Sequence, residues 1–229
     1  MPAVGLALRS ERGDVAERTL KVSEILTRLG GIARANAGFV LSCIAGLTAI
    51  NVLADQVSTG LIAILPGMIG GVVAHYYLTV RALERLGLRK GPAPNRFWDF
   101  WGLLILSSIG VFFGFVLLIV PGFYISARWA AAGAVLVSGD GQVGDALDRS
   151  WAMSGPSAWS IVATWLAMSL PGALIGFGLI IASEIWLPFL ARPMLHVVVF
   201  GASVASWLIG IAVYSLLRPP TDHLAEVFA

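Results

Sequence analysis

The chain has 229 residues, of which 58% are hydrophobic and 12% are charged, whereas ordinary soluble domains carry about 25% charged residues. A water-soluble fold cannot bury so large an apolar share, so the composition predicts an integral membrane protein. The formal net charge of +2 comes from basic residues in loops rather than from a basic stripe, which argues against nucleic acid as a partner.

The N-terminal region is polar before it becomes apolar. We expect 1–14 to be flexible and 15–36 to form an amphipathic surface helix, because Val22, Ile25 and Leu29 recur at helical spacing. Charged residues precede the first long apolar run, which is the wrong order for a cleaved signal peptide. The first membrane span is therefore expected to stay in the mature protein.

Long apolar stretches then follow one another along the chain. Helices of about 20 apolar residues cross the roughly 30 Å of bilayer hydrocarbon. The predicted spans are 37–54, 61–80, 98–120, 122–137, 158–182 and 194–217. The predicted fold is all-α, a bundle of six transmembrane helices occupying 37–218, with a second amphipathic surface helix inserted at 142–154 and a C-terminal tail at 219–229.

The loops differ in charge from one side of these spans to the other. Lys and Arg are concentrated before the first span and between the second and third, while the three alternate connections contain only Arg192. Because excess Lys and Arg mark the cytoplasmic side, both termini are predicted to be cytoplasmic.

An internal repeat is a further interpretation of the pattern. An apolar-Leu-x-Arg motif ends at Arg28, Arg85 and Arg149, and a proline follows each arginine at Pro66, Pro121 and Pro188. Three helical-hairpin units related by rotation about the membrane normal would give this spacing. The alternative is a chance match of short motifs in an apolar background.

The central block resembles a known family. The segments are 120–124 (VPGFY), 127–129 (ARW) and 146–151 (ALDRSW). They are similar to a bacterial six-span family that includes the membrane domain preceding some glycerophosphoryl diester phosphodiesterases and the YciC-like inner-membrane proteins. The resemblance implies a multi-pass protein of the bacterial inner membrane. Phosphodiesterase chemistry in that family belongs to a separate soluble domain with no counterpart in these residues, so we expect no such activity.

Arg128 is the main candidate site residue because it falls inside the fourth predicted span. An arginine at that depth costs a few kcal/mol unless it is paired or hydrated. The functional interpretation is an anion contact, such as a lipid phosphate, with Tyr124 and Trp129 nearby. The alternative is a structural arginine bound to Glu184, Asp99 or backbone carbonyls, or one that reaches the interface. The candidate ligand-binding residues are Arg128, Tyr124, Trp129 and Glu184.

The remaining chemistry-bearing residues do not form a recognisable motif. His75 and His196 have no second ligand at helical spacing, so both are interpreted as packing histidines. Cys43 is a lone cysteine inside the first span, and 139–144 satisfies GxGxxG without the preceding strand that the dinucleotide fingerprint requires. We therefore predict no catalytic residues, no metal site and no cofactor.

These observations favour a non-enzymatic envelope protein that binds membrane lipids, a partner membrane protein or a second copy of itself. One alternative is a transporter of a small or lipid-like solute, which predicts a cavity reaching Arg128. Another is a structural subunit of a larger membrane complex. A membrane enzyme acting on lipid headgroups would require Arg128, Glu184 and a histidine in one pocket.

Overall fold

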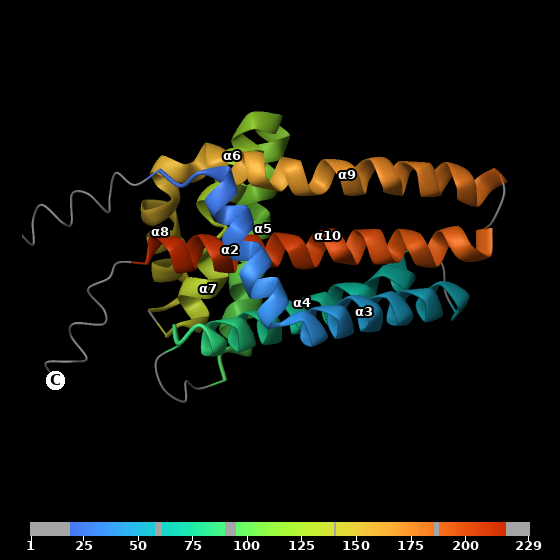
Figure 1. The fold of residues 1–229 in the computed structure, drawn as a ribbon, viewed down its shortest axis with the longest axis horizontal. Helices are drawn as coiled ribbons and strands as arrows, with labels where there is room; N and C mark the ends of the chain where they lie inside the picture. The colour runs from blue at the N-terminus through green and yellow to red at the C-terminus, as the bar shows by residue number, and fades with distance from the viewer. Residues whose placement is uncertain (1–18, 58–60, 90–94, 140, 186–187, 219–229) are drawn as a thin grey trace, which may run out of the picture.

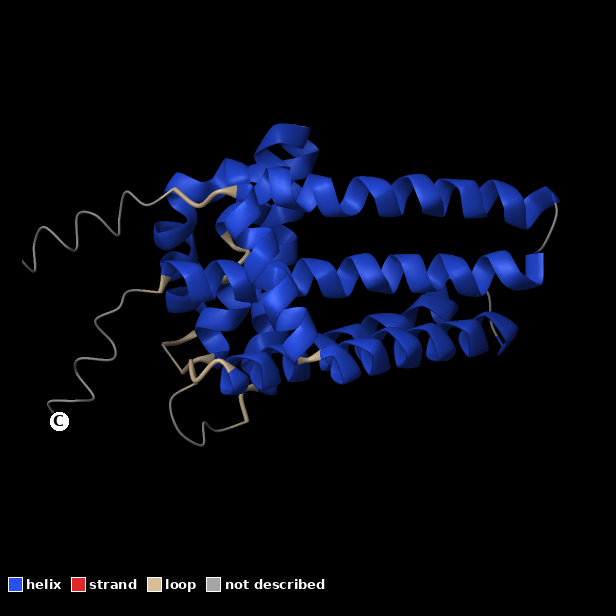
Figure 2. Cartoon of the chain, in the orientation of Figure 1, coloured by secondary structure: helices blue, strands red, loops and turns tan. Residues whose placement is uncertain are grey.

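A computed structural model describes residues 19–57, 61–89, 95–139, 141–185 and 188–218. Every regular element in these ranges is a helix (Figure 2). The helices are α2 (Val22–Ala35), α3 (Ala37–Val57), α4 (Leu61–Arg85), α5 (Phe97–Leu117), α6 (Ile119–Arg128), α7 (Ala132–Val137), α8 (Val143–Ser154), the 3-10 turn η1 (Gly155–Ser157), α9 (Ala158–Ile185) and α10 (Pro188–Leu217). The all-α prediction is confirmed for this part of the chain.

Six stretches within the described ranges are long and apolar enough to cross a membrane. They correspond to the six predicted spans, and they make the chain a multi-pass membrane protein. The fourth differs in detail, because a turn at 129–131 separates α6 from α7. There the amide of Ala132 donates to the carbonyl of Trp129, three residues back, instead of four. The predicted span at 122–137 corresponds to the candidate span Ile119–Val137, which α6 and α7 form with this turn between them.

The third predicted span also ends earlier than its apolar run. Leu118 adopts an extended conformation with φ −164° and ψ 152°, and this residue turns the chain from α5 into α6. The two helices then pack closely, because Gly114 presents no side chain to the backbone of Gly122. A Cβ on Gly114 would lie 3.0 Å from the Gly122 Cα. This close approach forms the α5–α6 hairpin.

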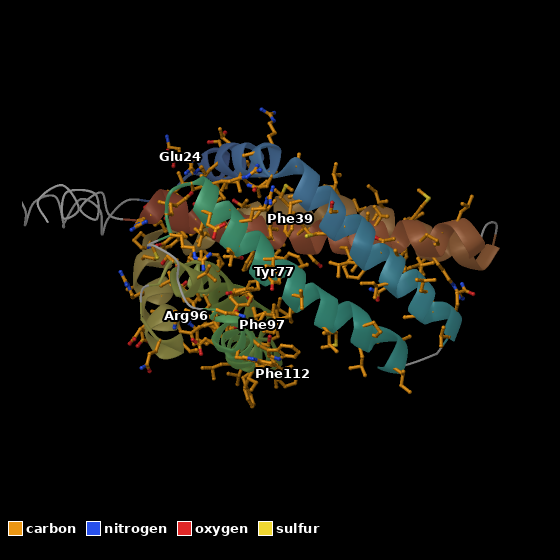
Figure 3. The ribbon with its side chains drawn as sticks, turned by 90° about the horizontal axis from the view of Figure 1, so that it is seen from below. Glu24, Phe39, Tyr77, Arg96, Phe97 and Phe112 are labelled. Carbon is orange, nitrogen blue, oxygen red and sulfur yellow. The ribbon has the colours of Figure 1, made fainter. Side chains whose placement is uncertain are left out.

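The long helices do not all run side by side. Helices α3, α4, α9 and α10 project toward the same end of the molecule, whereas the α5–α6 hairpin runs across them (Figure 1). In the view turned by 90°, α5 is seen nearly end-on, with Phe112 at the margin of the molecule (Figure 3). The apolar face of the hairpin thus points away from the other long helices.

Burial divides the molecule into a packed end and an open end. The packed end contains α2, α7, α8 and the C-terminal half of α10, where side chains from Val204 to Leu217 form much of the core. At the open end, α3, α4, α9 and the N-terminal half of α10 expose large apolar side chains such as Met68 and Phe177. Such an apolar surface requires a nonaqueous environment, so the open end is the part that must lie in hydrocarbon.

The two surface helices begin with the same capping arrangement. The amide of Lys21 donates to Glu24 at the start of α2, and the amide of Gln142 donates to Asp145 at the start of α8. A carboxylate at this position satisfies a backbone donor that the helix leaves unpaired. The structure places the first surface helix at 22–35, within the predicted 15–36; residues 1–18 lie outside the described part, as does the tail from 219 onward.

Helix α2 is fixed to the packed end by two long-range hydrogen bonds. The Leu20 amide donates to Ser157 Oγ at 2.8 Å, and Arg28 Nε donates to Ser215 Oγ on α10 at 2.9 Å. Ile25 and Ile32, on the apolar face of α2, are buried. The segment is therefore a docked helix of the packed end.

Candidate functional site

Arg128 is the last residue of α6, and its guanidinium lies between aromatic rings. The Cζ atom is 4.5 Å from the centroid of Trp151 on α8 and 5.6 Å from the centroid of Tyr124, one turn earlier on α6. The two rings meet edge to face with centroids 6.0 Å apart. Contacts of this kind with a cation contribute about 0.5–2 kcal/mol, most when water is excluded.

The polar contacts of this guanidinium are incomplete. Its Nε is buried and has no hydrogen-bond partner among the described residues, and no described carboxylate forms an ion pair with it. Asp99, one of the expected partners, pairs instead with Arg96 at 3.1 Å. The guanidinium is thus held by rings and retains unused donor capacity.

Position 184 is at the opposite end of α9 from the Arg128 guanidinium. Gly155, at the N-terminal side of α9, is in contact with the Arg128 guanidinium. Glu184 belongs to the other end of α9, about 40 Å further along at 1.5 Å per residue, and its side chain lies outside the described part of the structure. The grouping of Glu184 with Arg128 therefore falls on a side chain that the structure does not describe, and it stays a prediction.

The backbone carbonyl of Arg128, unlike its side chain, has hydrogen-bond partners. Its carbonyl oxygen accepts hydrogen bonds from Ser150 Oγ and Ser154 Oγ on α8, both at 2.8 Å. The end of a helix leaves such carbonyls without intrahelical partners. The two serines thus join α8 to the end of α6 and fix Arg128 beside Trp151.

The aromatic residues around Arg128 differ from those predicted. Tyr124 contacts the guanidinium as expected, but Trp129 packs over Gly110 on α5 and lies 6.0 Å from Trp151. Trp151 was missed as a site residue, although it stands in the block that carries the family resemblance. Its position opposite Arg128 depends on how α8 folds back, which sequence spacing does not encode.

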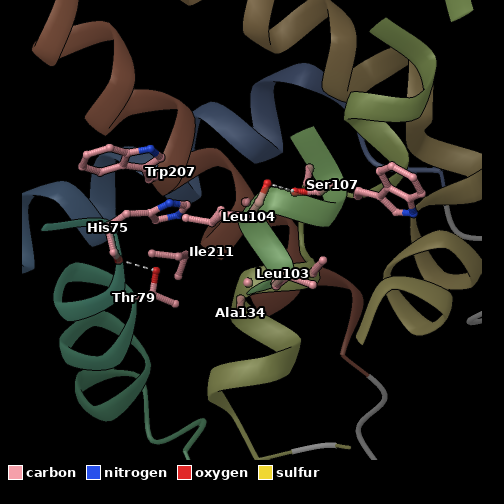
Figure 4. Close-up of a pocket in the computed structure, with 13 residues that line it drawn as sticks. His75, Thr79, Leu103, Leu104, Ser107, Ala134, Trp207 and Ile211 are labelled. Carbon is pink, nitrogen blue, oxygen red and sulfur yellow. Dashed lines mark hydrogen bonds between the residues drawn. The ribbon is translucent and has the colours of Figure 1, made fainter. Parts of the chain in front are cut away.

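A second cluster of polar and aromatic groups surrounds His75 on α4. Its ring stacks on Trp207 with centroids 4.7 Å apart and planes at 8°, and meets the edge of Phe100 at 4.9 Å. A cavity of about 60 Å³ lies beside it, between α4, α5, α7 and α10 (Figure 4). Room for a few waters is available there, and neither ring nitrogen of His75 has a hydrogen-bond partner among the described residues.

A larger groove of about 500 Å³ begins on the other side of His75. It runs between α4 and α10, with Asn51 of α3 and Ser108 of α5 also in its wall. At the far end of the groove, His196 Nε2 is 2.9 Å from Asp55 Oδ2 on α3. Neither cavity includes Arg128, although the smaller one reaches its neighbour Trp129.

The described residues contain no group of three His, Cys, Asp or Glu side chains placed to hold a metal ion. Cys43 is buried in α3 and unbonded. Comparison with protein-family models, with curated proteins and with solved structures finds no match to this chain.

Proposed function

We propose that this protein is a non-enzymatic, multi-pass protein of the bacterial inner membrane that binds an anionic lipid headgroup at Arg128. The observation that carries this proposal is a half-buried guanidinium clasped by Tyr124 and Trp151, with no carboxylate partner among the described residues. A planar cation with unused donors is suited to the oxygens of a phosphate. A purely structural arginine in an apolar setting is ordinarily neutralised by an acid.

The surroundings of Arg128 support an interfacial location. Trp159 is 60% exposed and Trp151 is 37% exposed, and both lie beside Tyr124. Partly exposed tryptophans are typical of the headgroup level of a membrane. Arg96, from the basic stretch between α4 and α5, is hydrogen bonded to the Leu136 carbonyl in the packed end, so we assign this end to the cytoplasmic side, with both termini there.

The internal repeat remains part of this proposal. In both α2–α3–α4 and α8–α9–α10, an acid-capped surface helix is followed by two long apolar helices. This common order supports two units related by rotation. The middle unit of the three would comprise the end of α4 and the α5–α6 hairpin. This hairpin runs across the other long helices, so the middle unit differs in form from the other two.

Transport of a lipid-like solute is the second candidate, favoured by the 500 Å³ groove. The transport hypothesis predicted a cavity that reaches Arg128, and the two cavities found near the bundle centre do not include it. A partner membrane protein or a second copy would instead cover the exposed apolar face of the α5–α6 hairpin.

The test is lipid retention in nanodiscs. The protein is reconstituted in mixed phosphatidylglycerol and phosphatidylethanolamine, and retained lipid is counted by native mass spectrometry for wild type, Arg128→Ala and Arg128→Lys. We expect Arg128→Ala to lose bound phosphatidylglycerol by roughly 10-fold, because hydrogen bonds to charged groups contribute about 1.5–3 kcal/mol. Arg128→Lys should retain part of the binding, since it keeps the charge but not the planar donors.

The matched control is Arg85→Ala, which removes an exposed cation from the packed end of α4. Equal lipid retention by wild type and Arg128→Ala, with Arg128→Ala unfolding at a lower temperature, would assign Arg128 a structural role and reject the proposal. Competition by inorganic phosphate alone would show that the site recognises a free anion rather than a lipid.

A further inference from the structure

The groove between α4 and α10 is separate from Arg128. The two helices run in parallel, so Ile64 and His196 lie at its outer end, and His75 and Trp207 lie at its inner end. Eleven residues separate the two ends on each helix, which corresponds to about 16 Å. The groove therefore runs through about half the thickness of a hydrocarbon core, and its volume of about 500 Å³ is within the range of small-molecule sites, roughly 300–1,000 Å³.

The open side of the groove faces hydrocarbon. Ile64, Met68 and Val199 belong to its wall and are also among the exposed large apolar side chains, at 52%, 62% and 48% exposure. A ligand can therefore enter sideways from the bilayer without crossing water. The inner end is closed by α5, which contributes Leu104 and Ser108 as it passes across the bundle.

The inner end offers hydrogen bonds that the protein leaves unused. The ring of His75 stacks on Trp207 (Figure 4) and meets the edge of Phe100, and neither of its nitrogens has a partner in the described ranges. Asn51 lies beside Gly67, toward the outer end of the groove; its Nδ2 donates to the Leu47 carbonyl, and its Oδ1 accepts no hydrogen bond from the same residues. Polar groups left unpaired in an apolar wall are costly unless something binds to them.

The absence of charged residues from the groove wall limits the chemical class of the ligand. None of the residues lining the groove is Lys, Arg, Asp or Glu. Asp55, an acid at the outer end of the groove, is already hydrogen bonded to His196. A charged headgroup would lose its hydration here without gaining a counter-charge, whereas an uncharged headgroup at the inner end needs only the hydrogen bonds that His75 offers.

We infer that the groove between α4 and α10 binds one uncharged, chain-bearing lipid, with its hydroxyl or carbonyl head at His75 and its chain along Met68, Val72 and Phe200. The site is independent of the proposed headgroup contact at Arg128, because the lipid is neutral and the two regions share no residue. The ligand class comprises neutral lipids with an alcohol, ester or ketone head.

The experiment uses two photoactivatable probes in nanodiscs. One is a monoacylglycerol with a mid-chain diazirine, and the other is the fatty acid with the same chain. We expect the neutral probe to label peptides of α4 and α10 saturably, with competition by unmodified monoacylglycerol. The fatty acid should label lipid-facing helices without saturation.

Two variants localise the site. Gly71 lies in the groove wall, and a Cβ there meets nothing within 4 Å, so Gly71→Leu fills the groove without a backbone clash. The matched control is Gly178→Leu on α9, also in open space but outside both cavities. We expect Gly71→Leu to remove the saturable labelling and Gly178→Leu to retain it.

His75→Phe preserves the ring stacking and should weaken the binding of the neutral probe roughly 5-fold, the effect of one hydrogen bond.

Saturable labelling that persists in a folded Gly71→Leu variant would overturn the inference. Equal saturable labelling by the fatty acid would show that the groove does not require an uncharged headgroup, and it would overturn that part of the inference. If Gly71→Leu does not fold, the affinity of His75→Phe for the neutral probe is the deciding measurement. An affinity equal to that of wild type would reject the site. Arg128→Ala should leave the labelling unchanged, which separates this inference from the proposed function.

Discussion

At Gly210, α10 passes close to the backbone of another segment. A Cβ at this position would overlap the carbonyl oxygen of Ala130, in the turn between α6 and α7. A backbone carbonyl cannot rotate away as a flexible side chain can. The absence of a side chain at Gly210 therefore fixes how closely α10 packs against this turn.

We expect Gly210→Ala to destabilise the protein by about 1–3 kcal/mol, the usual cost of overpacking. Thermal unfolding in detergent micelles measures the change. The control is Gly178→Ala on the exposed face of α9, which should be neutral or stabilising by up to about 1 kcal/mol because alanine favours helix. An unfolding temperature for Gly210→Ala equal to that of the control would contradict the close contact.

The residues of the site were only partly predictable from the sequence. An arginine in an apolar run is visible without a structure, and so is Tyr124 one turn before it. The partners of Arg128 and His196 are not visible, since Trp151 lies on another helix and Asp55 is 141 positions from His196. Helical spacing detects neighbours on one helix, whereas these pairs depend on which helices pack together.

At the scale of elements, the connection between α6 and α8 depends on two serines. Ser150 and Ser154 lie one turn apart on α8 and are fully buried, and both hydroxyls bond the Arg128 carbonyl. Since one carbonyl oxygen can accept two hydrogen bonds, either serine alone keeps it satisfied. The two hydrogen bonds to this carbonyl are therefore redundant.

We predict a non-additive effect for these serines. Ser150→Ala or Ser154→Ala alone should cost less than about 1 kcal/mol, and the double variant about 1–3 kcal/mol, because only then is a buried acceptor left unpaired. Thermal unfolding of the four proteins in the cycle measures the coupling. Ser42→Ala, which removes an exposed hydroxyl bonded to Gly38, is the control. Additive losses would show that the two hydroxyls act separately.

The elements themselves were predictable to different degrees. Apolar length located the long helices α3, α4, α9 and α10 within a few residues. The turn at 129–131 contains neither proline nor glycine, so no local signal marks it. It forms where Trp129 packs over Gly110 of α5, a contact between segments distant in the sequence. The crossing of the α5–α6 hairpin is likewise a result of packing rather than of hydropathy.

At the scale of the whole molecule, the division into a packed and an open end predicts an orientation. In a Cys43→Ala background, Ser23→Cys on α2 and Arg192→Cys on α10 each supply a single exposed thiol. A membrane-impermeant maleimide added to spheroplasts should label Arg192→Cys and spare Ser23→Cys, and inverted vesicles should give the reverse. Both thiols reacting from one side would contradict the assignment of the packed end to the cytoplasm.

The transverse position of the α5–α6 hairpin also has a consequence for how the protein is made. The insertion machinery evaluates each segment by its apolarity as it emerges, and α5 is the most apolar of the six candidate spans. Yet α5 takes its place through contacts with α7 and α8 as well as α4, and it closes the inner end of the groove between α4 and α10. Of these partners, α7, α8 and α10 are synthesised after α5. Biogenesis must therefore hold α5 in a provisional state until the C-terminal third of the chain arrives, and a truncated chain should expose this hairpin to membrane quality control.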